Sequence, residues 1–293
     1  MALIHPAKHI AHEHLFSVVN TELKRFPPNS QVHILDVGCG NGELIAYFQE
    51  HLLKLNQGLY IELYGFDVYD HGVQKVGFLQ QAIEHLSLRF PDIPWKERIS
   101  SLTTATSWPY SNGFFQVVIS NQVLEHVGNH CFFFANLTHI LSENGFSVHL
   151  FPLKHYIYEG HLHLPFVHRI MNYDLLMNYI KYLSILGVGK FRGHKKTGIS
   201  LGLYSESHAD YIHYFTNYIS YQQALMLGKE HGLRTSFRYT REFYIRKLRS
   251  LVKVDNSYEY KQHRSFFYDW ISVMILKYVS CITLFLEKTN IFP

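Results

Sequence analysis

The sequence has few of the features that mark secreted, membrane-spanning or nucleic-acid-binding proteins. Its three cysteines (Cys39, Cys131 and Cys281) show neither paired nor metal-ligand spacing, which fits a reducing cytoplasm. No basic segment followed by a long apolar run stands at the N-terminus, so we expect no signal peptide. The 27 basic and 23 acidic residues leave a net charge of +4, too small to indicate a nucleic-acid partner. We therefore expect a cytoplasmic protein.

Apolar residues, in contrast, are plentiful. They make up 47% of the 293 residues, and 16% of all residues are aromatic, so the chain can bury a sizeable core. This length suits one large α/β domain with an elaboration, or two small domains. The sequence contains no internal repeat and no low-complexity tract.

The most informative stretch joins a strand to a helix through a glycine-rich turn. The β-branched and aliphatic run from Val32 to Val37 predicts a buried strand, and the helical spacing of apolar residues from Glu43 to Leu55 predicts a helix. Between them, Gly38, Gly40 and Gly42 stand at alternate positions. Glycines let the backbone turn tightly and approach a ligand closely, so this segment resembles the opening of a nucleotide-binding βαβ unit.

The details argue against a dinucleotide. The glycine spacing is GxGxG instead of GxGxxG, and Asp36 lies two residues before the first glycine. A carboxylate there would repel a pyrophosphate but would orient a ligand's ammonium group, directly or through water. The next predicted strand, Leu59 to Phe66, ends at Asp67, where an acidic residue accepts hydrogen bonds from ribose hydroxyls. Asp67 could instead cap the following helix, but Asp70 is better placed for that role.

Two motifs carry a family resemblance. Residues 34–43 (ILDVGCGNGE) closely resemble motif I of class I S-adenosylmethionine-dependent methyltransferases, roughly L-D-[VIL]-G-C-G-x-G. Residues 122–127 (QVLEHV) resemble the last six positions of the segment x-x-[VA]-L-E-H-[VIL], which in this family follows the fourth strand. The similarity, to the type 11-like group, covers residues 31–151 and resumes at 218–235. The sequence departs from the pattern at Gln116, where the family usually has Asp.

The resemblance implies an α/β fold: a Rossmann-like, doubly wound sheet of seven mostly parallel strands with an antiparallel closing strand. We expect Ser236–Tyr239 and Glu242–Ile245 to form the closing antiparallel pair. The expected units are an N-terminal helix (1–30), a cofactor-binding methyltransferase core (31–151), an acceptor-binding insertion after strand five (152–217), the end of the core (218–250) and a basic, apolar helical tail (251–293).

The resemblance also implies the cofactor S-adenosyl-L-methionine. The family often places an acidic and a small residue after strand three to face adenine, but this sequence has Thr104 and Ala105, so the acidic partner is missing. The Thr104 hydroxyl and the Ala105 backbone could take its place, and Asn121 should touch the methionine part. The residues expected to bind the cofactor are Asp36, Gly38, Gly40, Asp67, Val68, Thr104, Ala105 and Asn121.

Histidines are the candidates for the chemistry. His126 follows strand four, as a wall of the cofactor pocket or as a general base. His161 and His163, in the insertion, would point the same way if extended, as a base or zinc pair does. No cysteine or carboxylate with ligand spacing completes a metal site, so we predict no metal.

The expected reaction is methyl transfer, at oxygen, to a small-molecule, glycan or lipid-linked acceptor. The insertion has a looser resemblance to bacterial methyltransferases of glycan and lipid biosynthesis. Two alternatives stay open. One is a catalytically silent cofactor-binding or scaffold protein. The other, less favoured, is a nucleic-acid methyltransferase, since no N-P-P-[YF] motif follows strand four.

The C-terminal segment combines basic, aromatic and apolar residues. An apolar run from Ile271 to Leu286, preceded by Phe266, Phe267 and Trp270, predicts a helix that is too short to span a bilayer. A basic, aromatic-flanked helix suits contact with a membrane surface, here through residues 264–287. The alternative is a helix docked on the domain or at a homodimer interface. The basic residues before it are Arg241, Arg246, Lys247, Arg249, Lys253, Lys261 and Arg264.

Overall fold

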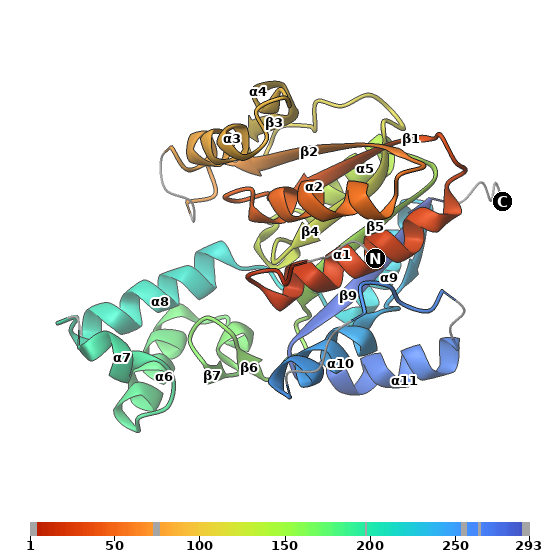
Figure 1. The fold of residues 1–293 in the computed structure, drawn as a ribbon. Helices are drawn as coiled ribbons and strands as arrows, with labels where there is room; N and C mark the ends of the chain where they lie inside the picture. The colour runs from red at the N-terminus through yellow and green to blue at the C-terminus, as the bar shows by residue number, and fades with distance from the viewer. Residues whose placement is uncertain (1–4, 73–76, 197, 253–256, 263–264, 289–293) are drawn as a thin grey trace.

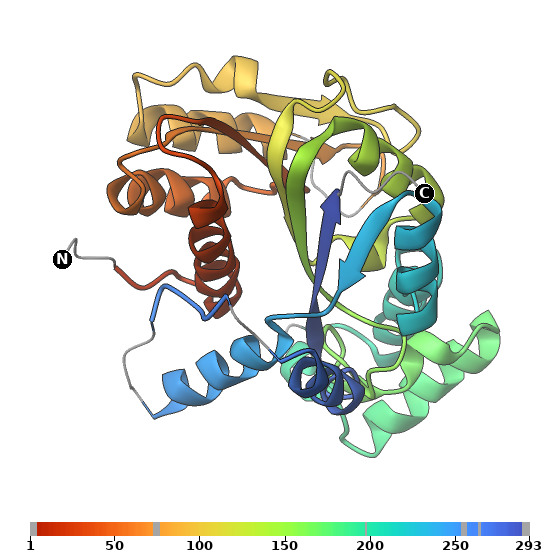
Figure 2. The ribbon, with the colours of Figure 1, turned by 90° about the vertical axis from the view of Figure 1, so that its right-hand side faces the viewer.

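A seven-stranded sheet with helices on both faces forms the centre of the molecule (Figures 1 and 2). The computed structural model describes residues 5–72, 77–196, 198–252, 257–262 and 265–288. The strand order is β3-β2-β1-β4-β5-β9-β8, and β9 runs antiparallel to both of its neighbours. The strands are β1 (Gln31–Val37), β2 (Tyr60–Val68), β3 (Ile99–Leu102), β4 (Phe115–Asn121), β5 (Leu141–Pro152), β8 (Leu233–Ser236) and β9 (Cys281–Lys288). The expected Rossmann-like, mostly parallel sheet is confirmed.

Two apolar layers hold the helices to the sheet. On one face, the side chains of α1 (Ile10–Glu22), α2 (Glu43–Leu55) and α3 (Phe78–Arg89) join alternate residues of the strands in one core. On the other face, α5 (His130–Ile140) and α9 (Tyr221–Glu230) cover a second core. The strands are buried on both faces, which explains why β1 and β4 read as nearly continuous apolar runs.

The closing strands differ from the prediction. They are β8 and β9, whereas Glu242–Ile245 lies inside the helix α10 (Thr240–Leu251). The apolar run at 271–286 is likewise not one helix: α11 (Phe266–Leu276) ends before β9 begins at Cys281. In β9, Ile282, Leu284 and Leu286 face one core and Phe285 the other, a period-two pattern set by pairing with β5, which is distant in sequence. Part of the expected tail therefore completes the central sheet.

The helix expected from Gly72 to Phe90 is observed as α3, and residues 73–76 lie outside the described residues. Gly77 precedes its first turn. The prediction that Asp70 caps this helix is therefore wrong, and Asp70 binds Thr104 instead.

The insertion packs as a small unit beside the carboxyl ends of the parallel strands (Figure 1). It contains the short pair β6 (Tyr158–Glu159) and β7 (Leu164–Pro165), and the helices α6 (Tyr173–Ile185), α7 (Phe191–Lys195) and α8 (Leu201–Phe215). Its own apolar cluster is formed by Leu162, Leu164, Val167, Leu176, Ile180, Tyr204, Ala209 and Ile212. Within the described residues, no helix is long and apolar enough to cross a membrane.

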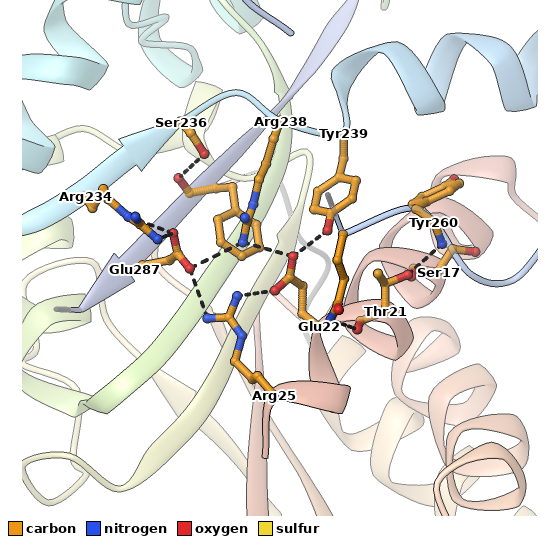
Figure 3. Close-up of polar contacts among 12 residues, drawn as sticks. Ser17, Thr21, Glu22, Arg25, Arg234, Ser236, Arg238, Tyr239, Tyr260 and Glu287 are labelled. Carbon is orange, nitrogen blue, oxygen red and sulfur yellow. Dashed lines mark hydrogen bonds and ion pairs between the residues drawn. The ribbon is translucent and has the colours of Figure 1, made fainter. Parts of the chain in front are cut away.

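A network of charged side chains ties the N-terminal helix to the last two strands (Figure 3). Glu287 of β9 accepts hydrogen bonds from Arg25 (3.0 Å), Arg234 (2.6 Å) and Arg238 (3.3 Å). Arg238 also lies 2.9 Å from Glu22 at the end of α1. Burial acts to raise the pKa of Glu287, but the nearby guanidinium groups outweigh it and hold this pKa below its usual value. Glu287 is therefore ionised in the folded protein.

Replacing Glu287 by alanine should destabilise the protein by up to about 3 kcal/mol at pH 7, because it leaves three arginines around an empty site. The 3–5 kcal/mol typical of a fully buried pair is reduced because Arg234 is largely exposed. Since the folded pKa of Glu287 is lowered, its contribution is complete above the unfolded carboxyl pKa and is lost as pH falls through the folded value. Urea unfolding at pH 7 and in acid checks this, with the exposed Glu143→Ala as control. Equal losses at both pH values would contradict the prediction.

Candidate active site

A cavity of about 1040 Å³ opens at the carboxyl ends of β1, β2 and β4. In open α/β sheets, ligands bind in the crevice outside these strand ends. All eight residues predicted to bind the cofactor line the cavity, and so does His126; His161 and His163 do not. The eight are Asp36, Gly38, Gly40, Asp67, Val68, Thr104, Ala105 and Asn121.

The glycine turn fits closely between two neighbouring segments. Gly38 has φ +69°, and a Cβ added there would lie 2.5 Å from Cγ2 of Val123. The N–H of Gly38 donates to the carbonyl of Phe66 (2.9 Å), and the N–H of Gly40 donates to Oδ2 of Asp67 (2.8 Å). Only glycine suits the left-handed backbone and the close contact at position 38. The turn therefore places the backbone of β1 and the carboxylate at the end of β2 on one side of the cavity.

Two buried carboxyl groups, Asp36 and Asp67, make this side of the cavity acidic. Burial, with the charge of Asp67, raises the pKa of Asp36. Burial also raises the pKa of Asp67, although the N–H groups of Gly40 and Val68 donate to its two oxygens and partly offset this effect. A positively charged ligand next to these groups would stabilise both ionised forms. The pair is therefore suited to a cationic ligand with hydroxyl groups.

Asp70 supplies the acidic group that the sequence after strand three lacks. Its Oδ1 accepts from the N–H of Thr104 (2.8 Å), and its Oδ2 accepts from the Thr104 hydroxyl (3.0 Å). Because this hydroxyl donates to Asp70, its oxygen keeps lone pairs that can accept from an amine. The sequence order hid this pair, since Asp70 follows strand two and Thr104 follows strand three.

His126 is held in one tautomer. It lies in the short 3₁₀ turn Leu124–His126, and its Nδ1 is 2.7 Å from the backbone carbonyl of Phe215. A carbonyl can only accept, so Nδ1 carries the proton and Nε2 of the neutral ring carries a lone pair. Burial lowers the pKa of His126, which favours this neutral form. His71 fixes the same turn by donating from Nε2 to the backbone carbonyl of His126 (2.7 Å).

His161 reaches His126 through Tyr211 of α8. The Tyr211 hydroxyl lies 3.2 Å from Nε2 of His161 and 3.5 Å from Nε2 of His126. On its other side, Nδ1 of His161 lies 2.7 Å from the buried carboxylate of Glu159. Burial acts to raise the pKa of Glu159, but the hydrogen bond from His161 and other contacts bring it below its usual value. The four side chains thus form one connected polar chain.

His163 does not belong to this group of hydrogen-bonded side chains. The N–H of His163 donates to the carbonyl of Glu159 (2.8 Å), so residues 159–163 form a turn, not the extended segment that would align His161 with His163. His163 is exposed and packs against Tyr158. Among the described residues, no group of three or more His, Cys, Asp or Glu side chains could hold a metal ion.

The adjacent Glu125 adds no negative charge at neutral pH. It is fully buried, neither side-chain oxygen has a hydrogen-bond partner among the described residues, and burial raises its pKa to about 8. Sequence reasoning assigned no role to Asp70, His71, Glu159 or Tyr211 in the site. Glu159 could have been found from the sequence, because it is an acidic residue two positions before the candidate His161. Tyr211 could not, because it lies 50 residues from His161 in the sequence and no motif links the two.

A family model described as a methyltransferase domain matches residues 10–186. Among solved structures, the YcgJ protein of Bacillus subtilis is 11% identical, with a TM-score of 0.48 over 96% of this chain and 100% of that chain. A SAM-dependent methyltransferase from Aquifex aeolicus is 10% identical, with a TM-score of 0.43 over 91% and 87%. Phosphoethanolamine N-methyltransferase 2 of Haemonchus contortus, in complex with S-adenosyl-L-methionine, is 12% identical, with a TM-score of 0.46 over 95% and 52%. No curated protein matches the sequence.

The family model covers more than half of the chain, so the chain belongs to the methyltransferase-domain family. It is therefore a methyltransferase, and its sequence motifs predict S-adenosylmethionine as the methyl donor. The residues of the cavity fit this cofactor, which carries an ammonium group, a sulfonium and two ribose hydroxyls. The two acidic groups suit its positive charge, and Oδ1 of Asn121 is a buried acceptor without a partner among the described residues.

Proposed function

We propose that the enzyme transfers the methyl group to an oxygen atom of a small-molecule, glycan or lipid-linked acceptor in the cytoplasm. The observation that supports this most is the partly buried His126, a cavity-lining residue whose Nε2 carries a lone pair because its Nδ1 donates to Phe215. A hydroxyl acceptor must lose its proton as the new bond forms, so it needs a base. A partly buried imidazole whose pKa is lowered is neutral, and so able to accept a proton, at neutral pH.

The cofactor supplies a methyl group already activated by the sulfonium. Asp67 would accept from the ribose hydroxyls, Asp36 would orient the ammonium group directly or through water, and Thr104 would accept from the adenine amine. Asn121 would contact the methionine part. These residues position the reacting carbon, which is the protein's main contribution to an in-line displacement. The glycine turn allows the backbone to lie against the ligand.

The acceptor's proton would pass to Nε2 of His126. Once protonated, Nε2 can donate to the Tyr211 oxygen, while the Tyr211 hydroxyl donates to Nε2 of His161. The proton then rests on His161, whose imidazolium is paired with the carboxylate of Glu159. In this proposal His126 is the base, His161 is the final proton site, and His163 takes no part.

Contact with a membrane surface, proposed from the sequence for residues 264–287, applies to only part of that segment. Arg264 lies outside the described residues, and β9 is buried in the sheet, so α11 is the part exposed to a partner. A homodimer through the same helix is the competing use of this surface.

Two measurements test the proposed function. Isothermal calorimetry should show binding of S-adenosylhomocysteine. Tritium from S-adenosyl-[methyl-³H]methionine should then enter a lipid or glycan extract in a base-stable form typical of an ether. Binding without any transfer would favour a cofactor-binding scaffold, and label in nucleic acid would favour the other alternative; either result contradicts the proposal.

A further inference from the structure

Helix α11 is largely apolar, yet it is mostly exposed. It carries a single charged residue, Asp269, and the only one of its 11 residues that is classed as buried is Val273. The exposed fractions of Phe266, Phe267 and Trp270 are 81%, 62% and 45%. An apolar helix surface of this kind is normally buried in protein or in lipid. Since the described residues leave most of this surface uncovered, it calls for a further partner.

The exposed apolar surface extends from α11 to its neighbours. α11 packs against α10, whose last turn exposes Leu248 and Leu251. After α11, the carbonyl of Tyr278 accepts from the N–H of Ile157 (3.0 Å), which joins this surface to the β6–β7 pair of the insertion. Ile157, Tyr158 and Phe166 of that region are also exposed.

Helix α6 of the insertion has an exposed apolar stripe of its own. Its exposed residues Leu175, Tyr182 and Ile185, with Met171 just before the helix, follow a helical repeat. In both ribbon views, α6, α10 and α11 lie along the same lower edge of the molecule (Figures 1 and 2). We call these exposed residues of α6, the β6–β7 pair, α10 and α11 the lower face. An apolar surface of this extent on one side of a protein marks an interaction site.

Basic side chains accompany the lower face. Arg241, Arg249 and Lys261 are exposed near α10, and Arg169 and Lys181 are exposed near α6. Lys and Arg outnumber Asp and Glu by nine to five in residues 241–288 and by seven to four in residues 152–217. Arg246 does not contribute to this exposed positive charge, because it is buried against Glu13. Lys253 and Arg264 lie outside the described residues.

We propose that the lower face binds the surface of a bilayer that contains anionic lipid. Aromatic rings settle at the boundary between headgroups and acyl chains, and nearby Lys and Arg are attracted by anionic headgroups. A second copy of the chain is a poorer fit, because a two-fold interface would bring the same basic residues of both copies together.

This inference also deepens the proposed function, because it names the bilayer as the source of the acceptor. Only this statement about the acceptor rests on the proposed function. α6 packs on α8, and α8 contributes Tyr214 and Phe215 to the wall of the cavity. An acceptor with a lipid tail could thus stay in the bilayer while its polar head enters the cavity. Binding to the bilayer does not itself require methyl transfer.

Flotation of the full chain with vesicles tests the inference. We expect binding to phosphatidylcholine vesicles with 30% phosphatidylserine, and at least tenfold weaker binding to pure phosphatidylcholine or in 0.5 M NaCl. The triple variant Phe266→Ala/Phe267→Ala/Trp270→Ala should lose at least tenfold in binding. The control Tyr60→Ala/Leu88→Ala removes exposed apolar side chains outside the lower face and should bind like the wild type.

The same samples separate this inference from the proposed function. S-adenosylhomocysteine binding by calorimetry should be equal in the wild type and both variants, which also shows that the variants are folded. The inference is overturned if the wild type ignores anionic vesicles, or if the triple variant binds them as well as the control does. A dimer in light scattering that the triple variant abolishes, without vesicle binding, would assign the face to a second copy instead.

Discussion

Replacing Asp67 by alanine should weaken S-adenosylhomocysteine binding by at least about 100-fold. If the carboxylate accepts from both ribose hydroxyls, it makes two hydrogen bonds to a charged group, each contributing about 1.5–3 kcal/mol. The same carboxylate holds the N–H groups of Gly40 and Val68, so the variant also loses the fixed shape of the glycine turn. Calorimetry at pH 7 measures the change in affinity.

The Asp67 variant should remain folded. The two N–H groups it frees belong to residues that line the cavity, where water can replace the carboxylate, so we expect a loss of about 1–3 kcal/mol in unfolding free energy. The exposed Asp92→Ala serves as the matched control and should change neither affinity nor stability. Wild-type affinity in the Asp67 variant would remove this residue from the site.

Replacing His126 by glutamine should slow methyl transfer by about 10²- to 10⁴-fold, the usual contribution of a general base. Glutamine has a similar reach but cannot accept a proton at neutral pH. Transfer of tritium to the acceptor fraction measures the rate, and the exposed His163→Gln is the control that should retain full activity. Because His126 would act on the acceptor, S-adenosylhomocysteine affinity should change little. A variant as active as the wild type would show that His126 is only a wall of the pocket.

The pH dependence of the rate follows from the protonation of His126. The neutral ring is the active form, so the rate should fall as pH drops through its pKa and level off above it. Burial holds this pKa below 6.5, which places the fall on the acidic side of that value. Tyr211→Phe cuts the link to His161 and should lower the plateau without abolishing the acid limb.

The part of the fold that forms the cavity could largely be predicted from the sequence. Its signals are local: the strand before Gly38, the turn itself and the acidic end of β2 lie within one βαβ unit. Parallel strand ends meet at one edge of the sheet, so residues such as Asp36 and Asp67 could be placed together from topology alone.

The remainder depended on contacts between distant segments. The apolar run after Trp270 has the composition of either a helix or a strand, and only pairing with β5 decides that Cys281 begins β9. Asp70 was assigned to a helix cap because its partner Thr104 follows a different strand. Similarly, the expectation that His161 and His163 point the same way assumes an extended segment. In the structure, the buried Glu159 accepts from the N–H of Leu162 and holds a turn, in which His161 lies next to Tyr211.

The position of β9 has a consequence during synthesis. It is inserted between β5 and β8, although it follows both of them in the chain. While residues 281–288 are still inside the ribosome, β5 has one unpaired edge and β8 lacks the strand that it pairs with. Such edges invite pairing with other chains, so this interval is the period in which we expect the protein to depend most on chaperones.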